Sequence, residues 1–283
     1  MKRVRVAAAM AVLGLVAAGC GGGDGDGESG STAATTSPAA VTTTAPSSPT
    51  TDAVSPTTTA DVGRPTVADV TLQGGSEPER YSYEVTYPDV AGLADPTVQK
   101  AVNDETRADV TAAIDEFVSG TDDFGPPLPE LADQRSAFTG RYQLARLDDG
   151  LLSFRLPVSR FYTGQAHPAR VLLTFTYDLG NGRRLALADL FLPGSPYLDR
   201  LSELSRQLLL AQPGFDQMPE FVTPGTEPKA ENFANWTVTD QDLVITFNEY
   251  QVAPYAMGTP HVSIPFASLR TLLDPAGPLA IHN

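Results

Sequence analysis

The sequence predicts an α+β protein with a mainly antiparallel sheet and two main helices packed on one face, preceded by a disordered tether. Three observations support this fold class. Several short stretches alternate apolar and polar residues, which is the period of half-buried strands. Two longer stretches repeat apolar residues at helical spacing. The strand-like and helix-like stretches do not alternate strictly along the chain, and this order favours antiparallel pairing over a parallel α/β sheet.

The composition excludes several classes of function. The chain has 283 residues, of which 41% are hydrophobic, and this is enough for a substantial core. Its formal net charge of −15 disfavours electrostatic binding to nucleic acid or to an anionic membrane surface, but suits a cationic partner. A single Cys and three His argue against an internal disulfide, a cysteine-based zinc site, an iron–sulfur cluster and a His-rich metal site. We therefore expect no cofactor and no metal.

The first twenty residues are typical of a bacterial lipoprotein signal. Basic residues near the start precede an apolar run, residues 6–18, that is too short to span a bilayer. The small residues before Cys20 resemble a bacterial lipobox, although Ala17 stands where leucine is usual. The resemblance implies a signal peptide over residues 1–19 and a diacylglycerol on Cys20, which would anchor the protein on the extracytoplasmic face of the cell membrane. The alternative is an ordinary cleaved signal in which Cys20 is incidental.

Residues 20–75 are rich in Gly, Ser, Thr and Pro and contain almost no large apolar side chains. Such a composition buries too little apolar surface to offset the entropy of ordering, so we expect a disordered tether. Its length would carry the folded part away from the membrane into the cell envelope. We divide the folded part into an N-terminal portion, residues 76–160, and a C-terminal portion, residues 161–283.

The N-terminal portion is expected to contain a strand, a long helix and a hairpin. Alternation over residues 81–87 predicts the strand. Asp95 followed by proline is a helix N-cap with proline at the first helical position, and apolar residues at helical spacing extend the helix over residues 96–118. An Asp-Asp-Gly turn joins residues 140–147 to residues 151–158 as a hairpin.

The C-terminal portion shows the same two kinds of pattern. In chain order, the expected elements are a strand over residues 169–178 with a Gly-Asn-Gly turn after it, a helix over 197–209, a hairpin of 236–239 with 243–248, a strand over 261–266 and a short helix over 268–273.

His167 is the first candidate for a functional side chain. The sequence contains no G-x-S-x-G, H-E-x-x-H or Walker motif, so we assign no catalytic residue and expect no enzyme activity. His167 stands between Ala166 and Pro168 in a predicted loop, where an imidazole can contact a ligand or act catalytically. We favour the alternative that its ring satisfies backbone groups of a tight turn, because no second His or paired base is nearby in the sequence.

The segment between the last two predicted strands is the second candidate. It places two Tyr, a Pro and a Met in one loop, a rigid and amphipathic composition that suits a binding surface. A loop that packs its own aromatics over the edge of the sheet explains the composition equally well. The candidate ligand-contact residues are Gln165, His167, Tyr250, Pro254 and Tyr255.

Three segments carry a family resemblance, namely residues 161–168, 177–191 and 242–266. In their order and spacing they resemble the extracellular domain of RsiV-type, lysozyme-sensing anti-sigma factors. The same RsiV-like domain accompanies peptidoglycan deacetylase domains and is similar to a mycobacterial secreted immunogenic protein. Gln165 departs from the family, in which glycine is usual, and would be strained if its position were left-handed. Because a lipobox and tether replace the cytoplasmic segment and spanning helix of the anti-sigma factors, we do not expect inhibition of a sigma factor.

Three functions remain open at this stage. The leading hypothesis is a lipid-anchored envelope protein whose RsiV-like domain binds an extracytoplasmic ligand without catalysis. The resemblance and the acidic charge both point to a cationic protein such as a lysozyme-type muramidase. The second hypothesis is a cleft for a cell-wall glycan or a lipid-like molecule. The third is an enzyme that acts on the wall through His167 and a distant carboxylate.

Overall fold

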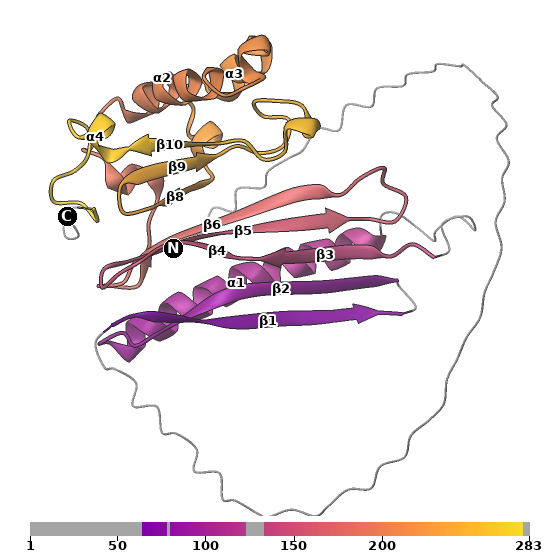
Figure 1. Cartoon of the computed structure of the whole chain (residues 1–283). Coiled ribbons are helices and arrows are strands. Elements are labelled where there is room, and N and C mark those ends of the chain that lie inside the picture. Colours follow the sequence, from indigo (N-terminus) through magenta and orange to yellow (C-terminus); the bar gives the residue numbers. More distant parts are fainter. Residues whose placement is uncertain (1–63, 78–79, 123–132, 280–283) are drawn as a thin grey trace, which may run out of the picture. The chain divides into compact units, whose positions relative to one another are not determined.

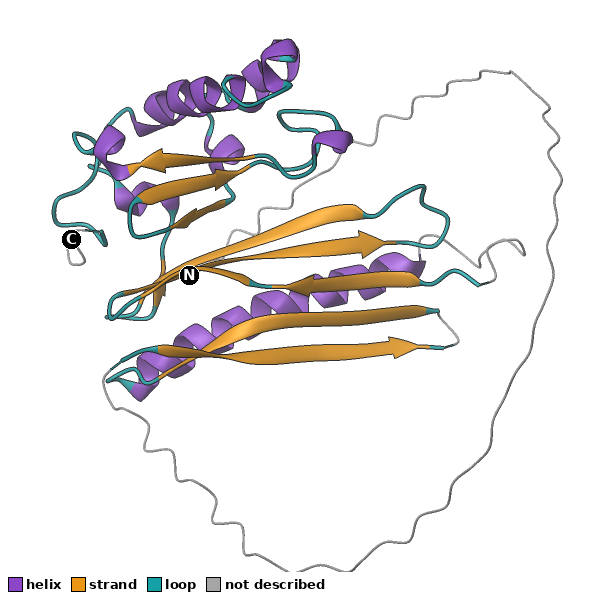
Figure 2. Ribbon diagram, viewed as in Figure 1, coloured by secondary structure: helices purple, strands orange, loops and turns teal. Residues whose placement is uncertain are grey.

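The computed structural model describes residues 64–77, 80–122 and 133–279 (Figure 1). Helices and strands both contribute extensively, so the predicted α+β class is confirmed (Figure 2). The expected signal peptide, Cys20 and the expected tether as far as residue 63 lie outside the described residues. The α-helices are α1 (Pro96–Thr121), α2 (Tyr197–Leu210), α3 (Pro219–Gly225) and α4 (Phe266–Leu269), and the 3-10 helices are η3 (Leu187–Leu190), η4 (Phe215–Gln217), η5 (Ala230–Phe233) and η6 (Tyr255–Met257).

The larger of two sheets has seven strands in the order β1-β2-β3-β5-β6-β7, with β4 paired to β5. Pairing is antiparallel between neighbours except for β2 and β3, which run parallel and are connected through α1. The strands are β1 (Thr66–Ser76), β2 (Tyr81–Ala91), β3 (Ser136–Arg141), β4 (Gln143–Leu147), β5 (Leu151–Phe161), β6 (Ala169–Asp178) and β7 (Arg183–Arg184).

The tether expected over residues 20–75 was wrong at its C-terminal end. Residues 66–75 belong to β1, which pairs with β2 from Thr66 opposite Ala91 to Ser76 opposite Tyr81. Val70 and Leu72 of this strand pack against the core beneath α1. The alternation of apolar and polar residues in β1 was not recognised, because the strand directly follows a long region rich in Ser, Thr and Pro. The bounds of the helix expected over residues 268–273 were also wrong, because α4 spans Phe266–Leu269.

Helix α1 lies along one face of the seven-stranded sheet (Figure 1). Its start is fixed by Asp95, whose Oδ1 accepts a hydrogen bond from the Thr97 amide at 2.7 Å. Because this bond favours the charged carboxylate, the pKa of Asp95 is lowered. In the core beneath the helix, the Phe117 ring stacks on Phe138 with a centroid distance of 5.2 Å and on Tyr162 at 5.4 Å. This face of the sheet is therefore held by apolar and aromatic packing.

The smaller sheet has three strands in the order β10-β9-β8. Alternate side chains of these strands, among them Ile245 and Ile264, are fully buried in a core that also contains Leu201 and Leu209 of α2. Trp236 belongs to the same core and is 7% exposed. The sequence predicted the strands and the helix but not their division between two sheets. The strands are β8 (Trp236–Val238), β9 (Asp242–Thr246) and β10 (His261–Pro265).

The two sheets contact each other through Leu151 of β5, which is buried in the core of the small sheet, and through polar side chains. Ser153 of β5 accepts a hydrogen bond from the Val238 amide of β8 at 3.0 Å, and its Oγ lies 2.9 Å from Thr176 Oγ1 of β6. Arg155 donates from Nη1 to Thr246 Oγ1 of β9 at 3.3 Å. These bonds fix the small sheet against the face of the large sheet opposite α1.

Candidate functional site

Two loops that are distant in the sequence meet at one place. The first connects β5 to β6 and contains His167; the second connects β9 to β10 and contains Tyr255. The Tyr255 hydroxyl donates to the carbonyl oxygen of Pro168 at 3.1 Å, across 87 residues of sequence. His167 Nδ1 lies 3.1 Å from the same oxygen, which places the imidazole proton on Nδ1 if the two are hydrogen-bonded.

The meeting point carries an exposed group of rings, which we name the aromatic cluster and define as His167, Tyr250 and Tyr255. The His167 and Tyr255 rings have centroids 4.0 Å apart and planes tilted by 31°. Tyr250 and Tyr255 have centroids 6.2 Å apart with a tilt of 32°. Tyr250 is 56% exposed and His167 is also exposed. The cluster therefore presents ring surface to the surroundings.

A charged pair supports the aromatic cluster. Glu249 accepts a hydrogen bond from the Arg170 amide at 3.1 Å, and its other carboxylate oxygen lies 3.9 Å from Arg170 Nε. The Glu249 side chain is only 10% exposed. The Arg170 guanidinium lies 5.9 Å from the centre of the Tyr255 ring and donates to Thr259 Oγ1 at 3.3 Å. Arg170 thus joins the start of β6 to both ends of the aromatic loop.

The loop that carries Tyr250 is fixed from within by Gln251. Its side-chain Nε2 donates to the carbonyl oxygens of Gly225 at 2.9 Å and Asn232 at 3.0 Å, and its side-chain Oε1 accepts from the backbone amide of Asn248 at 3.0 Å. Tyr250 itself has a φ of 62°, in the left-handed region that non-glycine residues rarely occupy. The surrounding hydrogen bonds hold this backbone conformation, and strained positions of this kind are common at functional sites.

The structure brings together three of the five predicted contact residues. Pro254 precedes the 3-10 helix η6 and accepts a hydrogen bond from the Met257 amide at 3.0 Å, so it shapes the loop beside Tyr255. Gln165 instead turns back on its own loop, where its side-chain oxygen accepts from the Tyr162 amide at 3.0 Å. The left-handed residue of that loop is Gly164, with a φ of 92°, so the departure from glycine at Gln165 introduces no backbone strain. Cys20 lies outside the described residues.

Sequence reasoning missed Arg170 and Glu249. Glu249 was visible as an acidic residue directly before Tyr250, and Arg170 as a basic residue near the start of a predicted strand. Their contact spans 79 residues, and no spacing rule connects them. The third hypothesis joined His167 to a distant carboxylate, but within the described residues the polar partner of the His167 ring is the Pro168 carbonyl oxygen and not an Asp or Glu.

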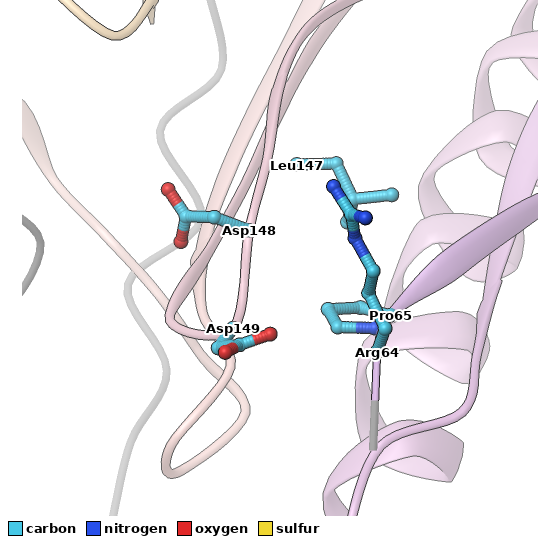
Figure 3. Close-up of a pocket in the computed structure, with 5 residues that line it drawn as sticks. All are labelled: Arg64, Pro65, Leu147, Asp148 and Asp149. Carbon is cyan, nitrogen blue, oxygen red and sulfur yellow. The ribbon is translucent and has the colours of Figure 1, made fainter. Parts of the chain in front are cut away.

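A separate cavity of about 380 Å³ lies between the start of β1 and the β4–β5 turn (Figure 3). Figure 3 shows the Asp149 carboxylate directed toward Arg64 and Pro65, whereas Asp148 points to the opposite side. Burial alone would raise the pKa of Asp148, but hydrogen bonds from the Gly150 amide, Arg146 and the Leu151 amide outweigh burial and lower it. Asp148 therefore serves its own turn and is not available to a ligand.

A larger cavity of about 520 Å³ beside η3 is acidic. Its carboxylates are engaged in local turns: Asp178 accepts from the Gly180 amide at 2.8 Å and Asp189 from the Ala186 amide at 2.7 Å. Among the residues described, no group of three or more His, Cys, Asp or Glu side chains is arranged to hold a metal ion. The same residues contain no helix long and apolar enough to cross a membrane.

Comparison with protein families matches one segment of the chain. Residues 188–267 fit the family described as "Protein of unknown function (DUF3298)". The matched segment extends from η3 through α2 and the small sheet to α4. It includes the Tyr250 and Tyr255 side of the aromatic cluster, whereas His167 precedes it.

Two curated proteins are distant relatives. The chain is 30% identical over 112 residues to a peptidoglycan-N-acetylmuramic acid deacetylase of Bacillus subtilis. The aligned segment covers 40% of this chain and 24% of the deacetylase. It is 24% identical over 195 residues to an esterase of Mycobacterium tuberculosis. This aligned segment covers 68% of the chain and 78% of the esterase. The chain thus spans about a quarter of the deacetylase and most of the esterase.

Two solved structures share the fold. A DUF3298 member from Bacteroides fragilis superposes with a TM-score of 0.55 at 16% identity, covering 77% of this chain and 96% of that protein. A DUF3298 protein from Pseudomonas aeruginosa superposes with a TM-score of 0.50 at 20% identity, covering 76% and 95%. Both matches extend well beyond residues 188–267, so the large sheet and the small sheet recur together.

Proposed function

We propose that this chain, which carries a DUF3298 domain over residues 188–267, is a lipid-anchored, non-catalytic binding protein of the bacterial cell envelope. The observation that carries the proposal is the aromatic cluster, in which rings from two distant loops form one exposed surface. Cys20 would supply the anchor. The resemblance to lysozyme-sensing domains and the distant relation to a peptidoglycan deacetylase support an envelope location.

The aromatic cluster has the properties of a protein-contact surface. Tyrosine is enriched at interfaces because its ring supplies apolar contact area and its hydroxyl supplies a hydrogen bond. Tyr255 is held by its bond to Pro168, and the loop before it is held by Gln251. Such a pre-formed surface loses little conformational entropy when a ligand binds.

The ligand that fits best is a cationic protein such as a lysozyme-type muramidase. A chain with a net charge of −15 attracts a cationic protein, and this attraction acts mainly on the association rate. The exposed Tyr250 and the half-buried Tyr255 would then supply the short-range contacts that determine the lifetime of the complex.

The test is biolayer interferometry of the full chain against a c-type lysozyme at low and high salt. We expect saturable binding that weakens with salt and is reduced by Tyr250→Ala. The matched control is Leu192→Ala, which removes another exposed apolar side chain outside the cluster. Absence of binding would contradict the muramidase ligand, and binding unchanged by Tyr250→Ala would contradict the site. Labelling with a radioactive fatty acid, lost in Cys20→Ser, would test the anchor.

A second candidate is binding of a cell-wall glycan. The exposed ring of Tyr250 favours it, because sugars stack on aromatic faces, and one relative is named for an activity on peptidoglycan. Co-sedimentation with purified peptidoglycan distinguishes this function from the first. Sedimentation lost in Tyr255→Ala, together with no affinity for lysozyme, would replace the leading proposal.

A third candidate is a wall-acting enzyme centred on His167, favoured by the match to an esterase over most of that protein's length. Hydrolysis of a chromogenic ester by the full chain is the direct assay. Turnover abolished by His167→Ala, with an unchanged thermal transition, would establish this function. Equal turnover in the variant would eliminate His167 as its centre.

A further inference from the structure

A cleft of about 230 Å³ opens between the two sheets, on the polar faces that meet opposite α1 and α2. Strands β4 and β5 of the large sheet form one side of this inter-sheet cleft, and β8, β9 and β10 of the small sheet form the other. It shares no lining residue with the aromatic cluster. Its polar side chains include Arg155, Thr237, His261 and Ser263.

Arg155 is the notable residue of the inter-sheet cleft, because no carboxylate pairs with it among the described residues. Other arginines of this acidic chain have such partners: Arg141 pairs with Asp69, and Arg146 pairs with Asp148. Arg155 has two neutral partners instead. It donates from Nε to Gln143 Oε1 at 2.8 Å and from Nη1 to Thr246 Oγ1 at 3.3 Å.

These two bonds orient the guanidinium without neutralising it. An arginine has five N–H donors in a rigid plane, so three donors of Arg155 have no hydrogen-bond partner in the part of the chain that the structure describes. A guanidinium oriented in this way is suited to a carboxylate, which it can bind through two parallel hydrogen bonds. Its partners on β4 and β9 fix it from both sheets, which reduces the entropy lost on binding.

The remaining lining of the inter-sheet cleft also favours an anion. No Asp or Glu lines it, although the chain carries 34 acidic residues. His261 and Ser263 stand two residues apart on β10, so their side chains project from the same face of the strand. Both are exposed, and both can donate a hydrogen bond toward an oxygen.

The size and apolar lining restrict the ligand further. Leu144 is 45% exposed, and together with Ala145 and Val244 it gives the cleft an apolar patch beside the cationic group. The volume of about 230 Å³ is below the roughly 300–1,000 Å³ of pockets for drug-sized molecules. The fitting ligand is therefore small and joins a carboxylate to a methyl-sized apolar group.

We propose that the inter-sheet cleft binds such a small carboxylate, with Arg155 as its anchor. Two sources share this chemistry: the C-terminal end of a short peptide that ends in alanine, and the lactyl group of a sugar acid. This ligand site is separate from the aromatic cluster, so it is independent of the proposed binding of a cationic protein.

The experiment is isothermal titration calorimetry of the full chain with two matched pairs of probes. D-alanyl-D-alanine is compared with its C-terminal amide, and N-acetylmuramic acid with N-acetylglucosamine, which lacks the lactyl carboxylate. We expect one or both acids to bind and their neutral counterparts not to bind. The acid that binds more tightly identifies the source. Equal binding of acid and neutral probe, or no binding of either acid at millimolar concentration, would overturn the proposal.

Variants then test the anchor. Arg155→Gln should weaken binding of the acid about tenfold or more, the loss typical of a hydrogen bond to a charged group. Arg155→Lys keeps the charge but lacks the fork, and should also bind more weakly. Arg141→Gln, which removes a guanidinium that already pairs with Asp69, is the control and should bind as the unchanged chain does.

The outcome for Arg155→Gln is decisive in both directions. Affinity for the acid that stays within twofold of the unchanged chain would overturn the role of Arg155. If this variant does not fold, the comparison between acid and neutral probe on the unchanged chain still tests the site. Tyr250→Ala should retain the carboxylate affinity, which separates failure of this proposal from failure of the lysozyme proposal.

Discussion

The two faces of the large sheet differ in chemistry although they share the same strands. Along β5, alternate residues such as Phe154 and Leu156 are fully buried beneath α1, whereas Ser153 and Arg155 face the small sheet. The helix face is held by ring stacking, as between Phe154 and Phe175 with centroids 4.6 Å apart. On the opposite face Leu151 packs into the core of the small sheet, and hydrogen bonds of fixed direction add to this contact. Apolar packing supplies most of the stability, whereas the polar contacts select one register and leave room for a cleft.

The largest expected effect is on the helix face. Phe154→Ala removes a fully buried ring that also meets Tyr142 edge-on at 6.1 Å, so we expect a loss of about 3–5 kcal/mol in the free energy of unfolding. Urea denaturation followed by circular dichroism measures the loss. Phe154→Leu, which keeps most of the apolar volume, should cost clearly less. Equal losses in the two variants would contradict the importance of ring packing on this face.

A smaller effect is expected on the polar face. Ser153→Ala deprives the buried Val238 amide of its acceptor and Thr176 of its partner, so we expect a loss of about 1–3 kcal/mol. The same denaturation experiment applies. Ser159→Ala, at an exposed position of the same strand, should change the stability by less than about 0.5 kcal/mol. If Ser153→Ala proved as mild as this control, the polar face would not fix the two sheets.

The β4–β5 turn makes the polar face sensitive to acid. The pKa of Asp148 in the folded state lies below its ordinary value of 3.8, so the folded state binds the proton more weakly than the unfolded state does. The contribution of the Asp148 carboxylate to the free energy of unfolding is therefore present above a pH of about 4 and is lost as the pH falls through the folded-state pKa. Asp148→Asn should flatten the pH dependence of the unfolding free energy between about pH 5 and pH 2.

The control for this acid effect is Asp149→Asn in the same turn. The Asp149 carboxylate makes no hydrogen bond within the described residues, so its removal should leave the pH dependence almost unchanged. A profile flattened equally by both substitutions would assign the acid sensitivity to the general charge of the turn.

Local signals predicted most individual elements. The Asp95-Pro96 cap defined the start of α1, and an apolar stretch gave β6 over residues 169–178, as the structure has it. Sheet membership was not predictable, because pairing between distant strands leaves no local signal. The polar residues of β5 illustrate the difficulty. Ser153 and Arg155 have the alternation of solvent-facing side chains, yet they contact a second sheet.

The candidate site was predictable in part for the same reason. Unusual composition identified the loop with Tyr250 and Tyr255, and an isolated imidazole identified His167. Their contact, at 4.0 Å between the His167 and Tyr255 rings, depends on how β6 and β9 are placed. Arg155 gave no signal, because the absence of a carboxylate partner is a property of the folded chain. Compositional outliers are thus visible in a sequence, whereas unbalanced charges require the structure.

The smallest expected effect on stability is at Tyr250, where stability and binding should separate. Its left-handed backbone costs a non-glycine residue about 1–2 kcal/mol, and its ring is largely exposed. Tyr250→Gly should therefore be more stable than Tyr250→Ala by up to about 1 kcal/mol, since glycine relieves the strain and alanine does not. Both variants should lose ligand affinity on the aromatic cluster. Stability kept together with affinity lost would show that the Tyr250 side chain serves contact rather than packing. If Tyr250→Gly were instead clearly less stable than Tyr250→Ala, the left-handed conformation would not be a source of strain, and this argument for a binding role would fail.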